Sequence, residues 1–231
     1  MLVNDIVAYM LNKPVWFRLS DLMLGFFSIL LAFLISRYAY RFYKQVNKTS
    51  LLYFSNAFFL LGISATMLFL FNSVMFLKNH TNLSGFLYSS LGQWIGMIFI
   101  LIFILVTISA FLNLVFITLG QINNKTKFLI FLMVLVVVMS VFRGLIYFYI
   151  LVLVLLAFIL YHSIVNYINT RHFLSFGFLI AMLFMALSFV FNLFVPANTF
   201  YYAVAQLFSF LALAVILVEI RMLSKTDEKD F

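Results

Sequence analysis

The sequence predicts an all-α, polytopic membrane protein with seven transmembrane helices. Hydrophobic residues make up 67% of its 231 residues and charged residues only 9%, whereas a soluble domain is roughly 45–50% apolar. The apolar runs reach roughly 20 residues, the length that a helix needs to cross a bilayer core of about 30 Å and about twice the length of a barrel strand. Cysteine is absent, so disulfides, thiolate metal sites and cysteine nucleophiles are excluded.

Residues 1–19 are expected to form a short interfacial amphipathic segment that lies on the membrane surface. Its apolar side chains share one helical face: Leu2, Val3, Ile6, Val7, Met10 and Leu11. A cleaved signal peptide is the rival interpretation, but the segment lacks a basic start and a small-residue cleavage site. Trp16 and Phe17 suit the aromatic belt of a membrane interface, and Ser20 or Asp21 is expected to cap the helix that follows.

Seven apolar runs are interpreted as spans. They cover residues 22–43, 51–77, 86–119, 127–142, 145–168, 173–195 and 198–221. The third run exceeds a perpendicular crossing, which predicts a tilted helix or an extension into the cytoplasm. Arg143 and Gly144 separate the fourth run from the fifth, because an arginine at mid-bilayer is costly and a glycine favours a turn.

The distribution of lysine and arginine predicts an external amino terminus and a cytoplasmic carboxyl terminus. On one side of the spans lie ten of the 14 basic residues: Arg37, Arg41, Lys44, Lys48, Lys125, Lys127, Arg171, Arg221, Lys225 and Lys229. On the other side lie the remaining four: Lys13, Arg18, Lys78 and Arg143. The positive-inside rule assigns the richer side to the cytoplasm, so the net charge of +8 needs no nucleic-acid partner. The cytoplasmic tail, residues 224–231, is too short for a kinase, cyclase or nucleic-acid-binding domain.

An internal similarity suggests a 3+1+3 pseudo-repeat, in which the first three and the last three spans are parallel repeats and the fourth connects them. The second span opens with Leu52-Tyr53-Phe54-Ser55 and the sixth with Leu174-Ser175-Phe176-Gly177. Asn72 and Asn192 close these two spans at similar distances. Phenylalanine-rich sequence also produces such matches by chance, so a repeat and a coincidence both remain open.

Polar residues inside the spans are the candidate functional residues, because a bilayer makes unsatisfied polar groups costly. The outer polar set, toward the external surface, is expected to bind a ligand and comprises Asn72, Ser89, Gln93, Trp94, Ser188, Asn192 and Gln206. The cytoplasmic polar set comprises Arg37, Asn56, Asn113, His162 and Glu219. The middle layer holds little beyond Ser64, Thr66, Thr107 and Ser209. It offers no carboxylate, lysine or histidine, which argues against a proton relay or an ion-coupled pump.

Several polar residues form pairs at i and i+4. The pairs are Ser89 with Gln93, Ser109 with Asn113, His162 with Asn166, and Ser188 with Asn192. Such pairs can line vestibules, or they can form hydrogen bonds between helices, which is the more ordinary interpretation. Arg37 and Glu219 are interpreted either as an ion pair that closes the cytoplasmic end or as two side chains that snorkel to the interface.

Enzymatic and cofactor chemistry is not expected. His162 is the only histidine inside a span, whereas zinc needs three or four convergent ligands. The sequence has no Gly-x-Ser-x-Gly elbow and no pair of mid-span aspartates. Residues 198–220 contain no lysine, so the Schiff base of a retinal protein is excluded. No cofactor and no metal is therefore expected.

A resemblance to known proteins lies at the first two spans. It rests on Arg37-Tyr38-Ala39-Tyr40-Arg41-Phe42-Tyr43-Lys44, followed by Leu52-Tyr53-Phe54-Ser55-Asn56-Ala57-Phe58-Phe59-Leu60-Leu61-Gly62-Ile63-Ser64. This part resembles uncharacterised seven-helix archaeal membrane proteins and the membrane sensor modules of some prokaryotic signalling proteins. The resemblance carries over no functional residue. It implies a sensor module without an output domain of its own, so that any signal would need a partner.

Three functions compete on these grounds. The first is a receptor-like or accessory protein of the cell membrane, surrounded by lipid, that senses a small or lipophilic ligand and acts through a membrane partner. The second is a small facilitative transporter or channel for an uncharged solute, which a true repeat would support. The third is a purely structural subunit. A continuous polar cavity through the middle layer would favour transport, whereas a layer sealed by phenylalanine and leucine would count against it.

Overall fold

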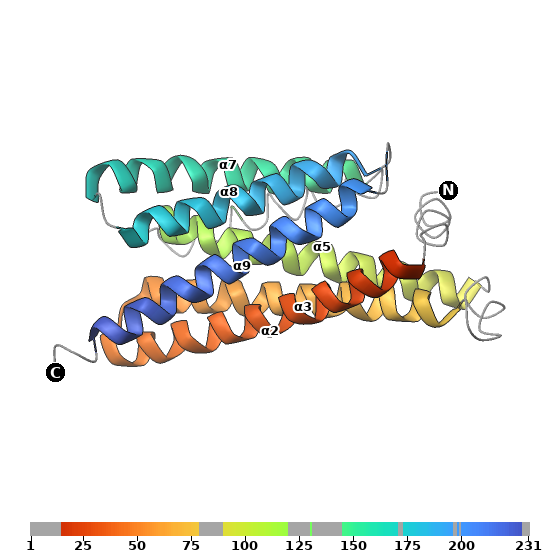
Figure 1. Ribbon diagram of the computed structural model, residues 1–231, viewed down its shortest axis with the longest axis horizontal. Coiled ribbons are helices and arrows are strands. Elements are labelled where there is room, and N and C mark those ends of the chain that lie inside the picture. Colours follow the sequence, from red (N-terminus) through yellow and green to blue (C-terminus); the bar gives the residue numbers. More distant parts are fainter. Residues whose placement is uncertain are drawn as a thin grey trace.

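The computed structural model is helical, and the residues that it describes contain no strand (Figure 1). These residues are 15–78, 90–119, 130, 145–170, 173–195, 198 and 200–227. Six helices are long and apolar enough to cross a membrane. They are α2 (Val15–Val46), α3 (Thr49–Lys78), α5 (Ser90–Leu119), α7 (Leu145–Thr170), α8 (Phe173–Leu193) and α9 (Phe200–Asp227). The chain is thus a multi-pass helical membrane protein.

Six of the seven expected spans are confirmed as helices. The expected fourth span, residues 127–142, lies outside the described residues apart from residue 130, and so do residues 1–14. Capping by Ser20 or Asp21 is wrong, because α2 begins five residues earlier and continues through both. No glycine or proline interrupts residues 15–24, so the first turns of the helix meet no barrier.

Two asparagines shape the short turns between neighbouring helices. Asn47 ends α2 in the left-handed region, with φ 54°, and its N–H donates to the carbonyl oxygen of Tyr43 at 2.8 Å. Asparagine tolerates this conformation better than most residues. Asn198 caps α9, because its Oδ1 accepts the backbone N–H of Phe200 at 2.9 Å. Both turns hold consecutive helices side by side.

The six helices form a closed ring in chain order. Each described helix packs against the next, and α9 packs back against α2 (Figure 1). Where α5 meets α7, the ring of Phe103 lies 5.6 Å from that of Phe148, which lies 6.3 Å from Phe189 of α8. Phe26 and Val154 are among the large apolar side chains exposed on the outside of the ring. An apolar exterior of this kind suits contact with lipid.

The helices point in two directions. α2, α5, α7 and α9 run one way, whereas α3 and α8 run the other way (Figure 1). We call the end of the bundle where α3 finishes the Asn72 end and the end where α9 finishes the Glu219 end. Because α5 and α7 are parallel, Leu119 lies at the Glu219 end and Leu145 at the Asn72 end. The two triplets α2-α3-α5 and α7-α8-α9 therefore share one pattern of directions.

Glu219 lies buried where α9 packs on α8, with 8% of its surface exposed. Its side chain covers Gly177, and a Cβ at that position would overlap the Glu219 carboxylate. The backbone N–H of Phe178 faces the carboxylate, while Oε1 has no hydrogen-bond partner in the described part of the chain. The ion pair of Glu219 with Arg37 is wrong, because the Arg37 side chain is exposed and no contact of 4.0 Å or less joins the two. Glycine at position 177 instead provides the space that the carboxylate occupies.

Gly177→Ala is expected to destabilise the bundle by about 1–3 kcal/mol, the usual cost of overpacking a filled interior. The new methyl group has to displace the Glu219 carboxylate. The measurement is the unfolding midpoint of the detergent-solubilised protein. Gly25→Ala is the matched control, because its Cβ would lie 3.5 Å from Phe69, an ordinary contact. In a Glu219→Ala background the Gly177→Ala change is expected to have little effect, and an undiminished loss there would contradict the contact.

Candidate functional site

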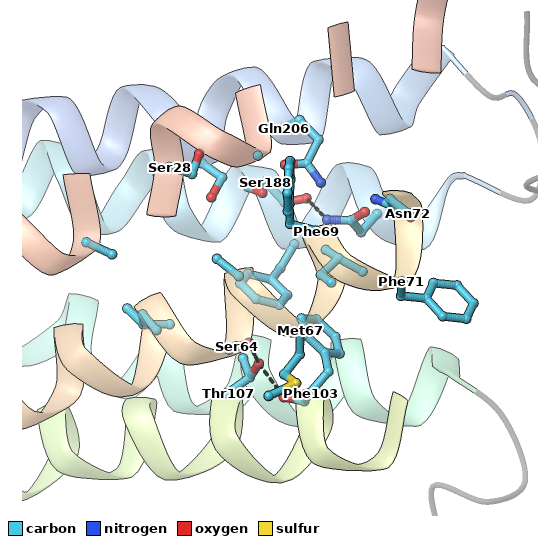
Figure 2. A pocket seen from close by; sticks show the side chains of 18 of the residues that line it. Ser28, Ser64, Met67, Phe69, Phe71, Asn72, Phe103, Thr107, Ser188 and Gln206 are labelled. Carbon is cyan, nitrogen blue, oxygen red and sulfur yellow. Dashed lines mark hydrogen bonds between the residues drawn. The ribbon is translucent and has the colours of Figure 1, made fainter. Parts of the chain in front are cut away.

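The bundle contains a cavity of about 180 Å³ in the half nearer the Asn72 end. All six described helices contribute to its wall (Figure 2). Its polar lining residues are Ser28, Ser64, Asn72, Thr107, Tyr149, Ser188, Asn192, Tyr202, Gln206 and Ser209. Aromatic rings fill much of the rest of the wall, among them Phe69, Phe103 and Phe189. The site thus combines scattered hydroxyl and amide groups with an apolar, aromatic surface.

The structure brings together four members of the outer polar set. Asn72 from α3, Ser188 and Asn192 from α8, and Gln206 from α9 all line the cavity. In Figure 2 the amides of Asn72 and Gln206 lie at the same end of it. Of the remaining members, Ser89 lies outside the described residues, and Gln93 and Trp94 belong to α5 but their side chains are not described. Asn72 and Asn192, which close the two similar segments of sequence, therefore meet at one site.

Sequence reasoning missed three polar contributors to this wall, Ser28, Tyr149 and Tyr202. Ser28 lies on α2 in line with two other small lining residues, Gly25 and Ala32, at spacings that share one helix face. These three small residues on one face of α2 could have indicated from the sequence that this face leaves space inside the bundle. Tyr202 carried no comparable signal, because tyrosines near a helix end are also common at the membrane interface.

Hydrogen bonds fix several of the lining groups. Ser64 of α3 and Thr107 of α5 share a hydrogen bond between their hydroxyl groups (Figure 2), and Thr107 also donates to the carbonyl oxygen of Phe103 at 2.7 Å. Nδ2 of Asn72 donates to the Tyr202 hydroxyl at 3.4 Å. These contacts join α3 to α5 and α3 to α9 across the wall of the cavity.

Two of the i and i+4 pairs, Ser109 with Asn113 and Ser188 with Asn192, form hydrogen bonds within one helix. Nδ2 of Asn192 donates to the backbone carbonyl of Ser188 at 3.0 Å, and Nδ2 of Asn113 donates to that of Ser109 at 2.8 Å. The nitrogen of each amide thus donates within its own helix, because a short side chain can reach the carbonyl four residues earlier. The interhelical interpretation is therefore wrong for these two pairs.

Ser28 differs from most of the other buried hydroxyls. It is 6% exposed, and its Oγ has no hydrogen-bond partner in the part of the chain that the structure describes. Several helical hydroxyls bond to a carbonyl of their own helix, as Ser163 does with Ile159 and Ser73 does with Phe69, both at 2.8 Å. Ser28 lines the cavity, and its buried hydroxyl is unsatisfied in the described residues.

The cavity ends near the middle of the bundle. Its innermost lining residues on four helices are Ala32, Leu61, Met185 and Leu213. One turn further along the same helices stand side chains that are at most 1% exposed: Ile35, Phe58, Met182 and Ile216. Beyond them, Ser36 and Ser55 are buried and hydrogen-bonded to each other at 3.3 Å. The described core toward the Glu219 end is thus mostly apolar, with Ser36, Ser55 and Glu219 among its few buried polar residues, and the described cavity does not extend through it.

The cytoplasmic polar set does not form a site. Arg37 and Asn56 are exposed, whereas Glu219 is buried against α8. His162 is partly buried on α7, where its ring lies 4.6 Å from that of Phe158. Asn113 bonds within its own helix. Among the described residues, no group of three His, Cys, Asp or Glu side chains could hold a metal ion.

Comparison of the chain with protein-family models, curated proteins and solved structures finds no match. The geometry of the cavity is thus the basis for any functional argument. Its described lining contains no lysine, arginine, histidine, aspartate or glutamate. A site of this composition can bind an uncharged molecule through hydrogen bonds and apolar contact.

Ser64→Ala and Thr107→Val are expected to be coupled in a double-mutant cycle by about 0.6 kcal/mol, the typical value of an interhelical hydrogen bond in a membrane protein. Each substitution removes one partner of the same bond, so the second costs less after the first. The unfolding free energy of the four variants gives the coupling. Ser64→Ala with Thr66→Val is the control pair, because the Thr66 hydroxyl bonds to Gly62 of its own helix at 2.8 Å. Coupling of equal size in both pairs would contradict a specific bond between α3 and α5.

Proposed function

We propose that the chain is a receptor-like or accessory protein of the cell membrane that binds a small uncharged ligand in its cavity and acts through a membrane partner. The observation that carries the proposal is a cavity lined by all six described helices and closed by an apolar core on one side. A ligand in this position contacts helices that are distant in the sequence. If the ligand binds one arrangement of those helices more tightly, it increases the fraction of molecules in that arrangement. A membrane partner that packs on the bundle can respond to this change.

The proposed architecture has seven spans, with residues 127–142 as the fourth. Two observations support it. Leu119 and Leu145 lie at opposite ends of the bundle, which supports a further crossing between them. The 25 residues between 119 and 145 exceed the roughly 20 that one helical crossing requires.

In the proposed orientation the Glu219 end faces the cytoplasm. Exposed basic residues gather at that end: Arg37, Arg41, Lys44, Lys48 and Arg221. The described helix positions at the Asn72 end include two basic residues, Arg18 and Lys78. The positive-inside rule relates this difference to the side of the membrane. The cavity then lies in the outer half of the bilayer.

Facilitated transport of an uncharged solute is the second candidate function. Two observations favour it, namely the shared directions of the two helix triplets and the convergence of Asn72 and Asn192 from corresponding helices on one cavity. Repeats that meet at a central site are typical of secondary transporters. The packed layer around Phe58 and Met182 opposes it, because transport would require this layer to come apart. Binding without passage therefore has the stronger support.

A cysteine at position 194 is expected to react with a membrane-impermeant maleimide added to intact cells, whereas a cysteine at position 48 is not. Phe194 and Lys48 are both exposed and lie at opposite ends of the bundle. The native sequence has no cysteine, so Phe194→Cys and Lys48→Cys each carry a single reactive thiol. Labelling of both variants in opened cells is the control. The reverse pattern in intact cells would place the cavity in the cytoplasmic half.

Proteoliposomes are expected to take up glycerol or urea no faster than protein-free liposomes of the same lipid. The apolar layer between the cavity and the Glu219 end blocks a continuous path. Swelling after an osmotic step, followed by light scattering, measures the rate. Uptake that exceeds the protein-free rate and returns to it in the cavity-filling variant Ser188→Leu would establish transport and overturn the proposal.

A further inference from the structure

The size of the cavity limits the ligand. Its volume of about 180 Å³ is close to the roughly 150 Å³ of an engineered apolar cavity that binds benzene, and below the roughly 300–1,000 Å³ of pockets for drug-sized ligands. A sterol, an acyl chain or a long polyene is too large to be enclosed in this space. A single six-membered ring with a small substituent fills it.

The charge of the wall limits the ligand further. The described lining offers hydroxyl groups, amides and aromatic rings but no ionisable acid or base other than tyrosine. An ionic ligand would lose its hydration without gaining a counter-ion, which is costly inside a bilayer. The ligand that suits this wall is therefore neutral.

The arrangement of the wall suggests how such a ligand binds. The hydroxyl of Ser28 is buried and has no partner in the described residues, and a serine hydroxyl can both donate and accept a hydrogen bond. Aromatic side chains of α3, α5 and α8 line the same space, including Phe69, Phe103 and Phe189. Flat rings pack favourably against aromatic faces and edges. The unpartnered hydroxyl of Ser28, further hydroxyl and amide groups and an extended apolar surface thus surround the same small space.

We propose that the ligand is a neutral, single-ring aromatic molecule with one hydroxyl or N–H group, which forms a hydrogen bond with Ser28 while the ring packs against the aromatic wall. This inference rests on the proposed ligand-binding function and narrows it. The proposed function allowed any small uncharged ligand. The ligand class proposed here is small, flat and uncharged, with a single polar group. Ser28 is the residue that distinguishes this class from a purely apolar guest.

Phenol and toluene test the proposal, because they have nearly the same size and differ in the hydroxyl group. Radiolabelled probes are equilibrated by dialysis with the full-length protein in lipid nanodiscs. Nanodiscs that contain Ser188→Leu or Ala65→Leu are measured in parallel. Each substitution fills the cavity, so the probe retained by these nanodiscs gives the amount that partitions into lipid. Ser28→Ala is expected to weaken cavity binding of phenol by about three- to tenfold, the usual effect of one neutral hydrogen bond. Binding of toluene is expected to stay within about twofold of the wild-type value.

Ser73→Ala is the matched control and is expected to leave both probes unchanged. Its hydroxyl bonds to the carbonyl oxygen of Phe69 at 2.8 Å, and it does not belong to the cavity lining. Equal losses of phenol and toluene in Ser28→Ala, or benzoate binding as tightly as phenol, would overturn the ligand class and leave cavity binding intact. If neither probe distinguishes the wild type from the two filled variants, the ligand class and the proposed binding function both fail.

Discussion

A polar group inside a bilayer has to find its partner within the protein, and this constraint organises the whole bundle. Several of the described hydroxyl and amide groups in the spans meet it locally, by bonding to a carbonyl of their own helix. Others meet it between helices, as Ser36 does with Ser55 and Ser64 with Thr107. Neither solution applies to the Ser28 hydroxyl, which lies beside the cavity, or to Oε1 of Glu219, which lies against Gly177. The unsatisfied groups are thus found both at the cavity and in the packed part of the bundle.

The transmembrane helices were predictable from the sequence, because bilayer thickness sets a minimum length for each apolar run. The start of α2 was not predictable from the sequence. A serine or an aspartate caps a helix only if the residues before it are not helical, whereas residues 15–20 are helical. Closure of the ring by α2 and α9 was also not predictable. That contact joins the two ends of the chain, and helices that are apolar on every side carry little information about which neighbour they pack against.

The candidate site was half predictable for a similar reason. Counting residues along a helix gives the depth of a side chain, and this placed Asn72, Ser188, Asn192 and Gln206 at one level, where they do meet. Counting does not give the direction in which a side chain points. Arg37 and Glu219 share an end of the bundle, yet the first is exposed and the second is buried over Gly177. The depth of a side chain follows from its position along its own helix. The residues that it contacts follow from how two helices pack against each other.

The position of the cavity along the helices has a mechanical consequence. One half of the bundle is packed solid and the other half contains unfilled volume, so the two halves resist compression unequally. Any change in the volume of the cavity alters the cross-sectional area of the protein in one leaflet only. The lateral pressure of that leaflet therefore acts directly on the cavity. If the cavity binds a ligand as proposed, lipid composition on a single side of the membrane becomes a variable that controls occupancy, together with the concentration of the ligand.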